Sequence, residues 1–301
     1  MTLLRTALIV ALALLTLPLS SAVRDPDSGG TSGLPIAAPE DVGMSSERLE
    51  RLSRVMQGYI DRQEVAGTVT LIARRGKVVH YEAQGWRDVE NDEAMTRGVI
   101  FRIASMTKPI TSVALMMLWE EGRFQLRDPI STWLPEFADM KVAVAPGASE
   151  YVAQPYKTVE ATRPITMQHV LTHTAGLANN YRGPTRAAYR ALGAQRQPND
   201  TSRDSTKRLA ELPLNFQPGD AWEYGPATNV VGDLVEAISG QALDEFMRER
   251  ILEPLGMVDT HFYFSEAKLD RFAALYRPGD DGKIVLTEAP SAESRYIREP
   301  H

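Results

Sequence analysis

Ser105 and Lys108 stand three residues apart at the start of a long apolar segment. On an α-helix, residues at this spacing lie on one face, with their side chains about 5–6 Å apart. The Lys108 amine is then close enough to take the proton of the Ser105 hydroxyl and leave an activated nucleophile. A free lysine amine is protonated at neutral pH, so this role requires burial or a cationic neighbour. The pair indicates acyl-transfer chemistry, provided that the fold supplies such an environment.

A second pair with the same spacing, Ser265 and Lys268, shows how weak the spacing is by itself. Ordinary residue frequencies yield roughly one Ser-x-x-Lys match by chance in a chain of this length. The second pair leads into a charged run, which is typical of the capped start of a solvated helix. Ser105 instead follows the strand-like residues 101–104 and opens an apolar helix predicted to continue through Trp119. A charged amine in a buried helix needs a partner, and this setting distinguishes the first pair from the second.

Tyr224 offers a further titratable group near a sharp turn. It lies in the run Trp222-Glu223-Tyr224-Gly225-Pro226, where the Gly-Pro turn is suited to presenting the phenol toward a cleft. Beside a cationic lysine the pKa of Tyr224 would fall, so that Tyr224 and Lys108 would share protons as a coupled pair. The alternative for an isolated tyrosine is packing in the core or on the surface.

His169 and His173 are four residues apart, which is also the spacing of zinc ligands on a helix. No glutamate lies between them, and the chain has no cysteine to complete a site. The remaining histidines are His80, His261 and His301. The chain also lacks a Walker loop, a Gly-x-Gly-x-x-Gly motif and a Gly-x-Ser-x-Gly elbow. We therefore expect neither a metal nor an organic cofactor.

The composition is that of an acidic globular protein. The 301 residues are 24% charged and 43% hydrophobic, with a formal charge of −6 and a pI near 5.5. Without a long run of Lys or Arg, this charge argues against a nucleic-acid partner. The absence of cysteine excludes disulfides, thiolate metal sites and cysteine nucleophiles. The sequence does not indicate an oligomeric state.

The N-terminus carries the pattern of a secretory signal peptide over residues 1–22. Arg5 supplies the positive charge, 7–19 form the apolar region, and small residues follow up to Ala22. An uncleaved anchor is the alternative, but the apolar run is short for a membrane span, so we expect no stable span after cleavage. The Gly-, Pro- and Ser-rich residues 23–40 are predicted to form a flexible leader. We expect a periplasmic or secreted protein.

The rest of the chain mixes helix and strand patterns. Ser45 and Ser46 are suited to capping a helix with one apolar stripe, and ordered structure is expected from about Ser45. Residues 68–72 and 77–81 are β-rich runs separated by a glycine-containing connection, which predicts an antiparallel hairpin. Residues 128–217 mix short helical patterns with proline loops, and helical spacing returns over 229–238 and 243–251.

These features together resemble the serine β-lactamase and penicillin-binding-protein superfamily, nearest to class C β-lactamases and the β-lactamase-like (family VIII type) carboxylesterases. The resemblance runs from about Glu40 to Phe262 and implies an α+β fold, an antiparallel sheet flanked by helices plus an α-rich lobe, in a domain over 41–301. It also implies that Ser105 is the acylated nucleophile, Lys108 its lysine partner and Tyr224 the partner base. The resemblance is carried by four runs in the family's order: FRIASMTK at 101–108, ITMQHVLTHTAGL at 165–177, FQPG at 216–219 ahead of Tyr224, and LEPLGM at 252–257.

Two departures refine what the resemblance implies. The asparagine of the family's Tyr-x-Asn motif is replaced by Pro226, which favours esterase-like members. The family's third motif, on a strand that supplies one oxyanion N–H, has no match after Tyr224. We therefore expect a domain truncated at its C-terminal end, with an incomplete sheet. The predicted function is a serine hydrolase acting through an acyl-enzyme on a small ester or β-lactam-like carbonyl. The alternative is a non-catalytic fragment or pseudoenzyme that at most binds an acyl or peptidoglycan-like ligand.

Overall fold

The computed structural model describes residues 33–146, 155–194, 200–294 and 296–297. The predicted signal peptide, 1–22, lies outside the described residues and stays a prediction. The first part of the predicted leader, 23–32, lies outside them as well. Within the described residues, no helix combines the length and the apolar composition that crossing a membrane requires.

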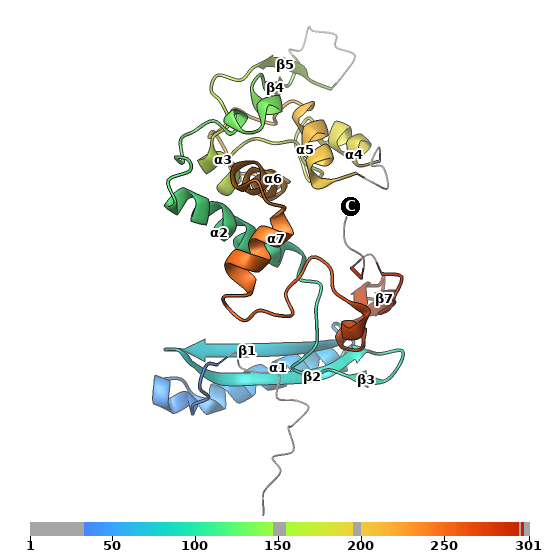
Figure 1. The fold of residues 1–301 in the computed structure, drawn as a ribbon. Helices are drawn as coiled ribbons and strands as arrows, with labels where there is room; N and C mark the ends of the chain where they lie inside the picture. Colours follow the sequence, from blue (N-terminus) through green and yellow to red (C-terminus); the bar gives the residue numbers. More distant parts are fainter. Residues whose placement is uncertain (1–32, 147–154, 195–199, 295, 298–301) are drawn as a thin grey trace, which may run out of the picture.

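A small antiparallel sheet with a helix on one face forms the base of the molecule (Figure 1). The helix begins where the sequence predicts, because the Ser45 side chain accepts a hydrogen bond from the backbone N–H of Arg48 at 3.3 Å. Its half-buried apolar side chains pack on the sheet, and its charged side chains face solvent. The elements are α1 (Ser46–Asp61), β1 (Gly67–Arg74), β2 (Lys77–Asp88) and β3 (Glu93–Ala94).

The hairpin of β1 and β2 confirms the predicted pair of strands, with longer strands and a tighter turn. Arg75 and Gly76 both have positive φ angles, of 52° and 71°, as a two-residue turn between twisted strands requires. Contacts with β2 begin earlier in the chain than expected. Val78 exchanges backbone hydrogen bonds with Pro35 and Ala37, at 2.9 and 3.0 Å, so the end of the predicted leader packs beside this strand ahead of the short helix η1 (Pro39–Val42).

The α-rich lobe lies on the other side of the sheet and is built around α6 (Figure 1). This helix is buried on most of its surface, and it packs against α2, α3, α5 and α7. One large apolar core holds these helices together. The elements are η2 (Ala104–Met106), α2 (Thr107–Glu120), η3 (Ile130–Thr132), η4 (Pro135–Phe137), α3 (Met167–Leu171), α4 (Arg186–Ala194), α5 (Ser202–Ala210), α6 (Ala227–Ser239), α7 (Leu243–Met247) and η5 (Arg248–Leu252).

The lobe also contains a hairpin that the sequence patterns do not predict. Strands β4 (Lys141–Val144) and β5 (Lys157–Glu160) pair antiparallel. All four residues of β5 are exposed, so this strand lacks the alternation of buried and exposed side chains that marks a strand in sequence. Its pairing with β4 holds it in place, and only the tertiary structure reveals that pairing.

The last described segment returns to the sheet. It contains η6 (Glu266–Arg271), β6 (Leu275–Pro278) and β7 (Ile284–Glu288), and the two strands pair with one another. Within the described part of the chain, β1 pairs only with β2, and no residue of β1 is buried. The architecture is mixed α+β, as predicted.

Candidate active site

Ser105 lies in a short 3₁₀ turn, η2, that leads from an extended segment into α2. Two backbone hydrogen bonds fix that segment to the C-terminal part of the chain: Ile100 N–H donates to the Arg271 carbonyl at 2.8 Å, and Ala273 N–H donates to the Ile100 carbonyl at 3.0 Å. Ala104 then adopts a φ of 42°, which is uncommon for a residue other than glycine. This backbone presents Ser105 at the exposed N-terminal end of α2.

The side chain of Arg102 also fixes the extended segment before η2 to the C-terminal part of the chain. Its side chain is only 8% exposed, donates to the Ala273 carbonyl at 2.6 Å, and pairs with Glu288 at 2.7 Å. The guanidinium carbon lies 3.9 Å from the centre of the Phe272 ring. A buried charge held by an acidic partner and an aromatic face strongly favours one backbone path. The turn that carries Ser105 is therefore braced by residues about 170 to 190 positions later in the chain.

Tyr224 reaches the site from the segment that precedes α6. The next two residues turn the chain, and Pro226 is the N-cap residue of α6. One residue before Tyr224, the backbone N–H of Glu223 donates to the His173 carbonyl at 2.9 Å. Tyr224 thus lies directly before the Gly225-Pro226 turn, and the presentation of its phenol toward a cleft stays a prediction.

The three candidate side chains meet at one point. The Ser105 Oγ lies 2.7 Å from the Tyr224 Oη and 3.0 Å from the Lys108 Nζ, so one hydroxyl contacts both a phenol and an amine. The Lys108 Nζ also lies 4.9 Å from the centre of the Tyr224 ring. The pKa of the Tyr224 phenol is lowered by hydrogen bonding to Lys108 and then to Ser105. At a given pH, a larger fraction of Tyr224 than of a free tyrosine is therefore the phenolate, the form that can accept a proton.

His173 lies beside Tyr224, although its sequence setting shows only its spacing from His169 and its place in the run at 165–177. Its ring stacks on the Tyr224 ring, with centroids 5.3 Å apart and planes inclined by 23°. The pKa of His173 is lowered by burial and then by the charge of Lys108, so the imidazole is neutral at pH 7. Its φ angle is 56°. A histidine just past a helix end has no distinctive sequence pattern, so only the fold shows that it meets Tyr224.

Two exposed aromatic side chains complete the surroundings of Tyr224. The ring of Tyr181 lies 5.7 Å from the Tyr224 ring, and the ring of Trp222 lies 6.3 Å from the His173 ring. Tyr181 and Trp222 are 58% and 59% exposed, so both can contact an apolar group of a bound substrate.

The structure separates the two histidines of the i, i+4 pair. His169 caps its own helix, because its Nδ1 accepts from the Thr166 N–H at 3.2 Å and its backbone N–H donates to the Thr166 hydroxyl at 3.3 Å. The helix ends at Leu171, so His173 no longer shares a helical face with His169. Across the described residues, no three His, Asp or Glu side chains are grouped so that they can hold a metal ion.

The second Ser-x-x-Lys pair has a structural role. The Lys268 Nζ donates to the Val258 carbonyl at 2.7 Å and pairs with Asp259 at 3.0 Å. The pKa of Asp259 falls to about 2, chiefly because of Arg271 and then Lys268. Lys268 is thus engaged by Asp259, and the Ser265 backbone caps η6 without a side-chain hydrogen bond.

Comparison with known proteins shows the family to which the chain is similar. A family model described as Beta-lactamase matches residues 52–295. Protein Rv1367c of Mycobacterium tuberculosis is 39% identical over 222 residues, covering 73% of this chain and 53% of that protein. Esterase EstB of Burkholderia gladioli is 34% identical over 241 residues, covering 79% of this chain and 57% of that protein.

A solved structure shares the fold. The structure of EstCE1, a hydrolase with promiscuous acyltransferase activity, superposes with a TM-score of 0.66 at 29% identity, covering 80% of this chain and 59% of that one. The chain spans about half the length of the curated relatives that it matches. The resemblance predicted from the four sequence runs is confirmed: the chain belongs to the beta-lactamase family, within the superfamily of serine β-lactamases and penicillin-binding-protein-like proteins.

Proposed function

We propose that this protein is a serine hydrolase that cleaves carboxylic esters through an acyl-enzyme on Ser105. The observation that carries the proposal is the pair of contacts on one exposed hydroxyl, to Tyr224 at 2.7 Å and to Lys108 at 3.0 Å. Hydrolase or acyl-transfer chemistry is the shared character of the esterase and acyltransferase relatives. The predicted signal peptide adds the proposal that the reaction takes place outside the cytoplasm.

In the acylation step, Ser105 Oγ attacks the ester carbonyl carbon while its proton passes to Tyr224. Lys108 donates a hydrogen bond to the same Oγ and holds a cationic group beside the phenol ring. This charge favours the deprotonated form of Tyr224, which makes Tyr224 the base. The backbone N–H of Ser105 lies in the first turn of η2, where it has no partner within the helix and can bond the developing oxyanion.

To complete acylation, Tyr224 passes the proton to the leaving alkoxide oxygen as the ester C–O bond breaks, and the alcohol departs. In the second half of the reaction, a water molecule attacks the acyl carbon while Tyr224 takes its proton. The bond from that carbon to Ser105 Oγ then breaks, Tyr224 returns the proton to Oγ, and the carboxylic acid leaves. A second alcohol can take the place of that water, which would give acyl transfer in place of hydrolysis.

Esters are favoured over β-lactams because Pro226 occupies the position of the asparagine in the family's Tyr-x-Asn motif. Pro226 offers no side-chain amide, so a substrate amide would find no hydrogen-bonding partner there. The exposed rings of Tyr181 and Trp222 beside Tyr224 are suited to an apolar acyl or alcohol group.

The test measures covalent labelling separately from turnover. The protein is treated with a fluorophosphonate, its mass is measured, and p-nitrophenyl butyrate hydrolysis is followed in parallel. Ser105→Ala should abolish both signals, whereas Ser265→Ala, the matched control at the second Ser-x-x-Lys pair, should leave both intact. Undiminished labelling of the Ser105→Ala protein would sink the proposal. A wild-type protein that forms no covalent adduct would favour the non-catalytic alternative.

A further inference from the structure

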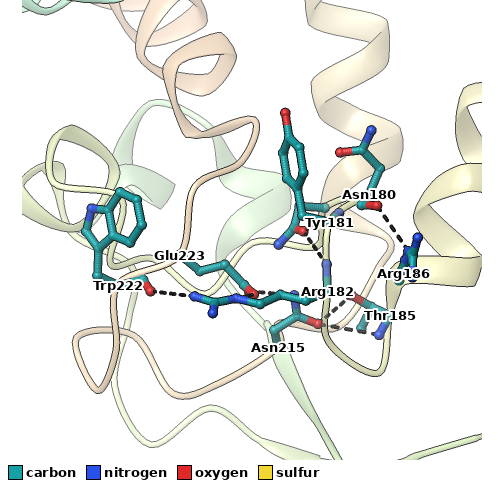
Figure 2. A network of polar contacts seen from close by, with 9 residues as sticks. Asn180, Tyr181, Arg182, Thr185, Arg186, Asn215, Trp222 and Glu223 are labelled. Carbon is teal, nitrogen blue, oxygen red and sulfur yellow. Dashed lines mark hydrogen bonds and ion pairs between the residues drawn. The ribbon is translucent and has the colours of Figure 1, made fainter. Parts of the chain in front are cut away.

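Glu223 carries a buried carboxylate directly before Tyr224 in the chain. Its side chain is only 6% exposed, although a glutamate is ordinarily solvated. One carboxylate oxygen accepts from the Arg182 Nε at 2.7 Å, and the other accepts from the Asn215 Nδ2 at 2.8 Å (Figure 2). Both oxygens are therefore engaged, one by Arg182 from another segment and the other by Asn215, eight residues earlier in the same segment.

These contacts belong to a network that ties the loop 179–185 to the segment 215–224. Arg182 donates through its second nitrogen to the Trp222 carbonyl at 3.2 Å, and the Thr185 hydroxyl donates to the Asn215 Oδ1 at 2.6 Å (Figure 2). The network thus fixes the two residues that precede Tyr224, through hydrogen bonds to the Trp222 carbonyl and to the Glu223 side chain. Because Glu223 N–H also donates to the His173 carbonyl, both the main chain and the side chain of this residue are held.

The buried Glu223 carboxylate and its Arg182 partner indicate that residue 223 does more than fill space. A buried carboxylate destabilises a fold unless it is paired, and Arg182, which supplies the pairing, is itself 65% exposed. An apolar residue at position 223 would meet the packing requirement without that cost. Within the described residues, the charged and titratable groups shown in contact with Tyr224 are Lys108 from α2, His173 just beyond α3, and Tyr181 from the loop; the Glu223–Arg182 pair adjoins Tyr224 along the chain.

We propose that Glu223 is a positioning residue that, through Arg182 and Asn215, holds Tyr224 against Ser105 and Lys108. Glu223 acts on the reaction only through Tyr224. The inference rests on the proposed function, because it assigns Tyr224 the role of the base. Loss of the carboxylate frees the turn, and Tyr224 then moves away from the Lys108 ammonium that favours its deprotonated form.

The experiment compares Glu223→Ala, Glu223→Gln and Arg182→Met with a matched control. The control is Asp220→Asn. Asp220 lies on the same segment as Glu223, and its carboxylate also pairs with an arginine, Arg163, but both side chains of that pair are half-exposed. Two quantities are measured for each protein: the rate of fluorophosphonate labelling as a function of pH, and the pKa of Tyr224. The chain has 10 tyrosines, so the tyrosinate absorbance of each protein is compared with that of its own Tyr224→Phe version.

A positioning role and a purely electrostatic role of Glu223 predict opposite changes in the pKa of Tyr224 when Glu223 is replaced by alanine. If Glu223 only supplied a negative charge, Glu223→Ala would lower the pKa of Tyr224 and Arg182→Met would raise it. If Glu223 positions Tyr224, both variants raise that pKa toward the free value of roughly 10. Labelling then slows by about 100-fold, the typical effect of a displaced catalytic group. Glu223→Gln keeps an acceptor for Arg182, so it should be labelled at least roughly tenfold faster than Glu223→Ala.

Each outcome decides the inference. Raised pKa values in both disrupting variants, rescue by Glu223→Gln and an unchanged Asp220→Asn protein support it. A lowered or unchanged pKa of Tyr224 in Glu223→Ala overturns it, even if labelling slows through general loss of structure. If Glu223→Ala does not fold, Glu223→Gln decides the matter, because it removes the charge and keeps an acceptor for Arg182. A pKa of Tyr224 below that of the wild type then indicates a charge effect and overturns the inference, whereas a pKa at or above the wild-type value supports it. A wild-type protein that is never labelled refutes the proposed function, yet the tyrosinate titration still shows whether Glu223 places Tyr224.

Discussion

Removing one oxygen atom, with Tyr224→Phe, separates the chemistry of the phenol from its packing. The substitution keeps the ring, and with it the stacking on His173 at 5.3 Å and the contact with Tyr181 at 5.7 Å. It deletes only the group that lies 2.7 Å from Ser105 Oγ. Tyr224 is partly exposed, so water can replace the lost hydrogen bond, and we expect the free energy of unfolding to change by less than about 1 kcal/mol.

The effect on reactivity should be far larger. A positioned general base accelerates a reaction by about 10²–10⁴-fold. Lys108 still donates to Ser105 in the variant, so part of the activation survives and we expect the lower part of that range. A loss of roughly 100- to 1000-fold corresponds to about 3–4 kcal/mol in the acylation barrier. The ratio of this loss to the small change in stability identifies a chemical role.

The assay is the second-order rate of fluorophosphonate labelling between pH 6 and pH 10, with mass spectrometry to count adducts. The wild-type rate should rise with pH and level off above the pKa of Tyr224, which lies below its ordinary value of 10. In Tyr224→Phe this ionisation should vanish from the profile. If the variant retained more than about a tenth of the wild-type rate, or kept the same pH profile, the assignment of Tyr224 as base would be refuted.

Two further predictions concern stability. Burial raises the pKa of Asp233 in α6 to about 6 from 3.8, so the folded protein holds this proton more tightly and should lose up to about 3 kcal/mol as pH rises from 4 to 6. Asp233→Asn should regain that amount in urea unfolding at pH 8 and nothing at pH 4; an equal gain at both pH values would contradict the cause. Gly176→Ala should lower thermal stability by more than about 2 kcal/mol, because an added Cβ would lie 2.4 Å from the Phe216 carbonyl oxygen in a backbone with a φ of 78°. Its control, Gly240→Ala, shares the positive φ of 77° but meets no atom within 4 Å, so an equal loss in both would show that the close contact is harmless.

Local chemistry made several features of the fold predictable. A serine can cap α1 through its own side chain, and a glycine allows the tight turn of the hairpin, so neither depends on distant residues. Lys108 follows Ser105 by three residues near the start of α2, which brings amine and hydroxyl within 3.0 Å. The phenol of Tyr224 was predictable only through the order of the sequence runs, because 119 residues separate it from Ser105.

Other parts depend on contacts that no local pattern encodes. His173 has a positive φ and lies beyond the end of its helix, so its spacing from His169 misleads about where its ring points. Strand β5 is exposed throughout and exists because β4 pairs with it. Glu223 reads in sequence as an ordinary charged surface residue, and its burial becomes visible only when Arg182 and Asn215 are placed beside it.

The sequence by itself determined which groups are available: one hydroxyl and one amine at helical spacing, a phenol at a turn, no cysteine, and a family order of motifs. A separation of three residues, across the junction of η2 and α2, is enough to bring Ser105 to Lys108, because the geometry is local. Only the tertiary structure decided that Tyr224 contacts Ser105 and that the His173 ring stacks on the Tyr224 ring. It also decided that Lys268 pairs with Asp259 instead of with a serine. The physical reason is that proton transfer requires contact within about 3 Å, and contact between distant segments is set by the packing of the whole core.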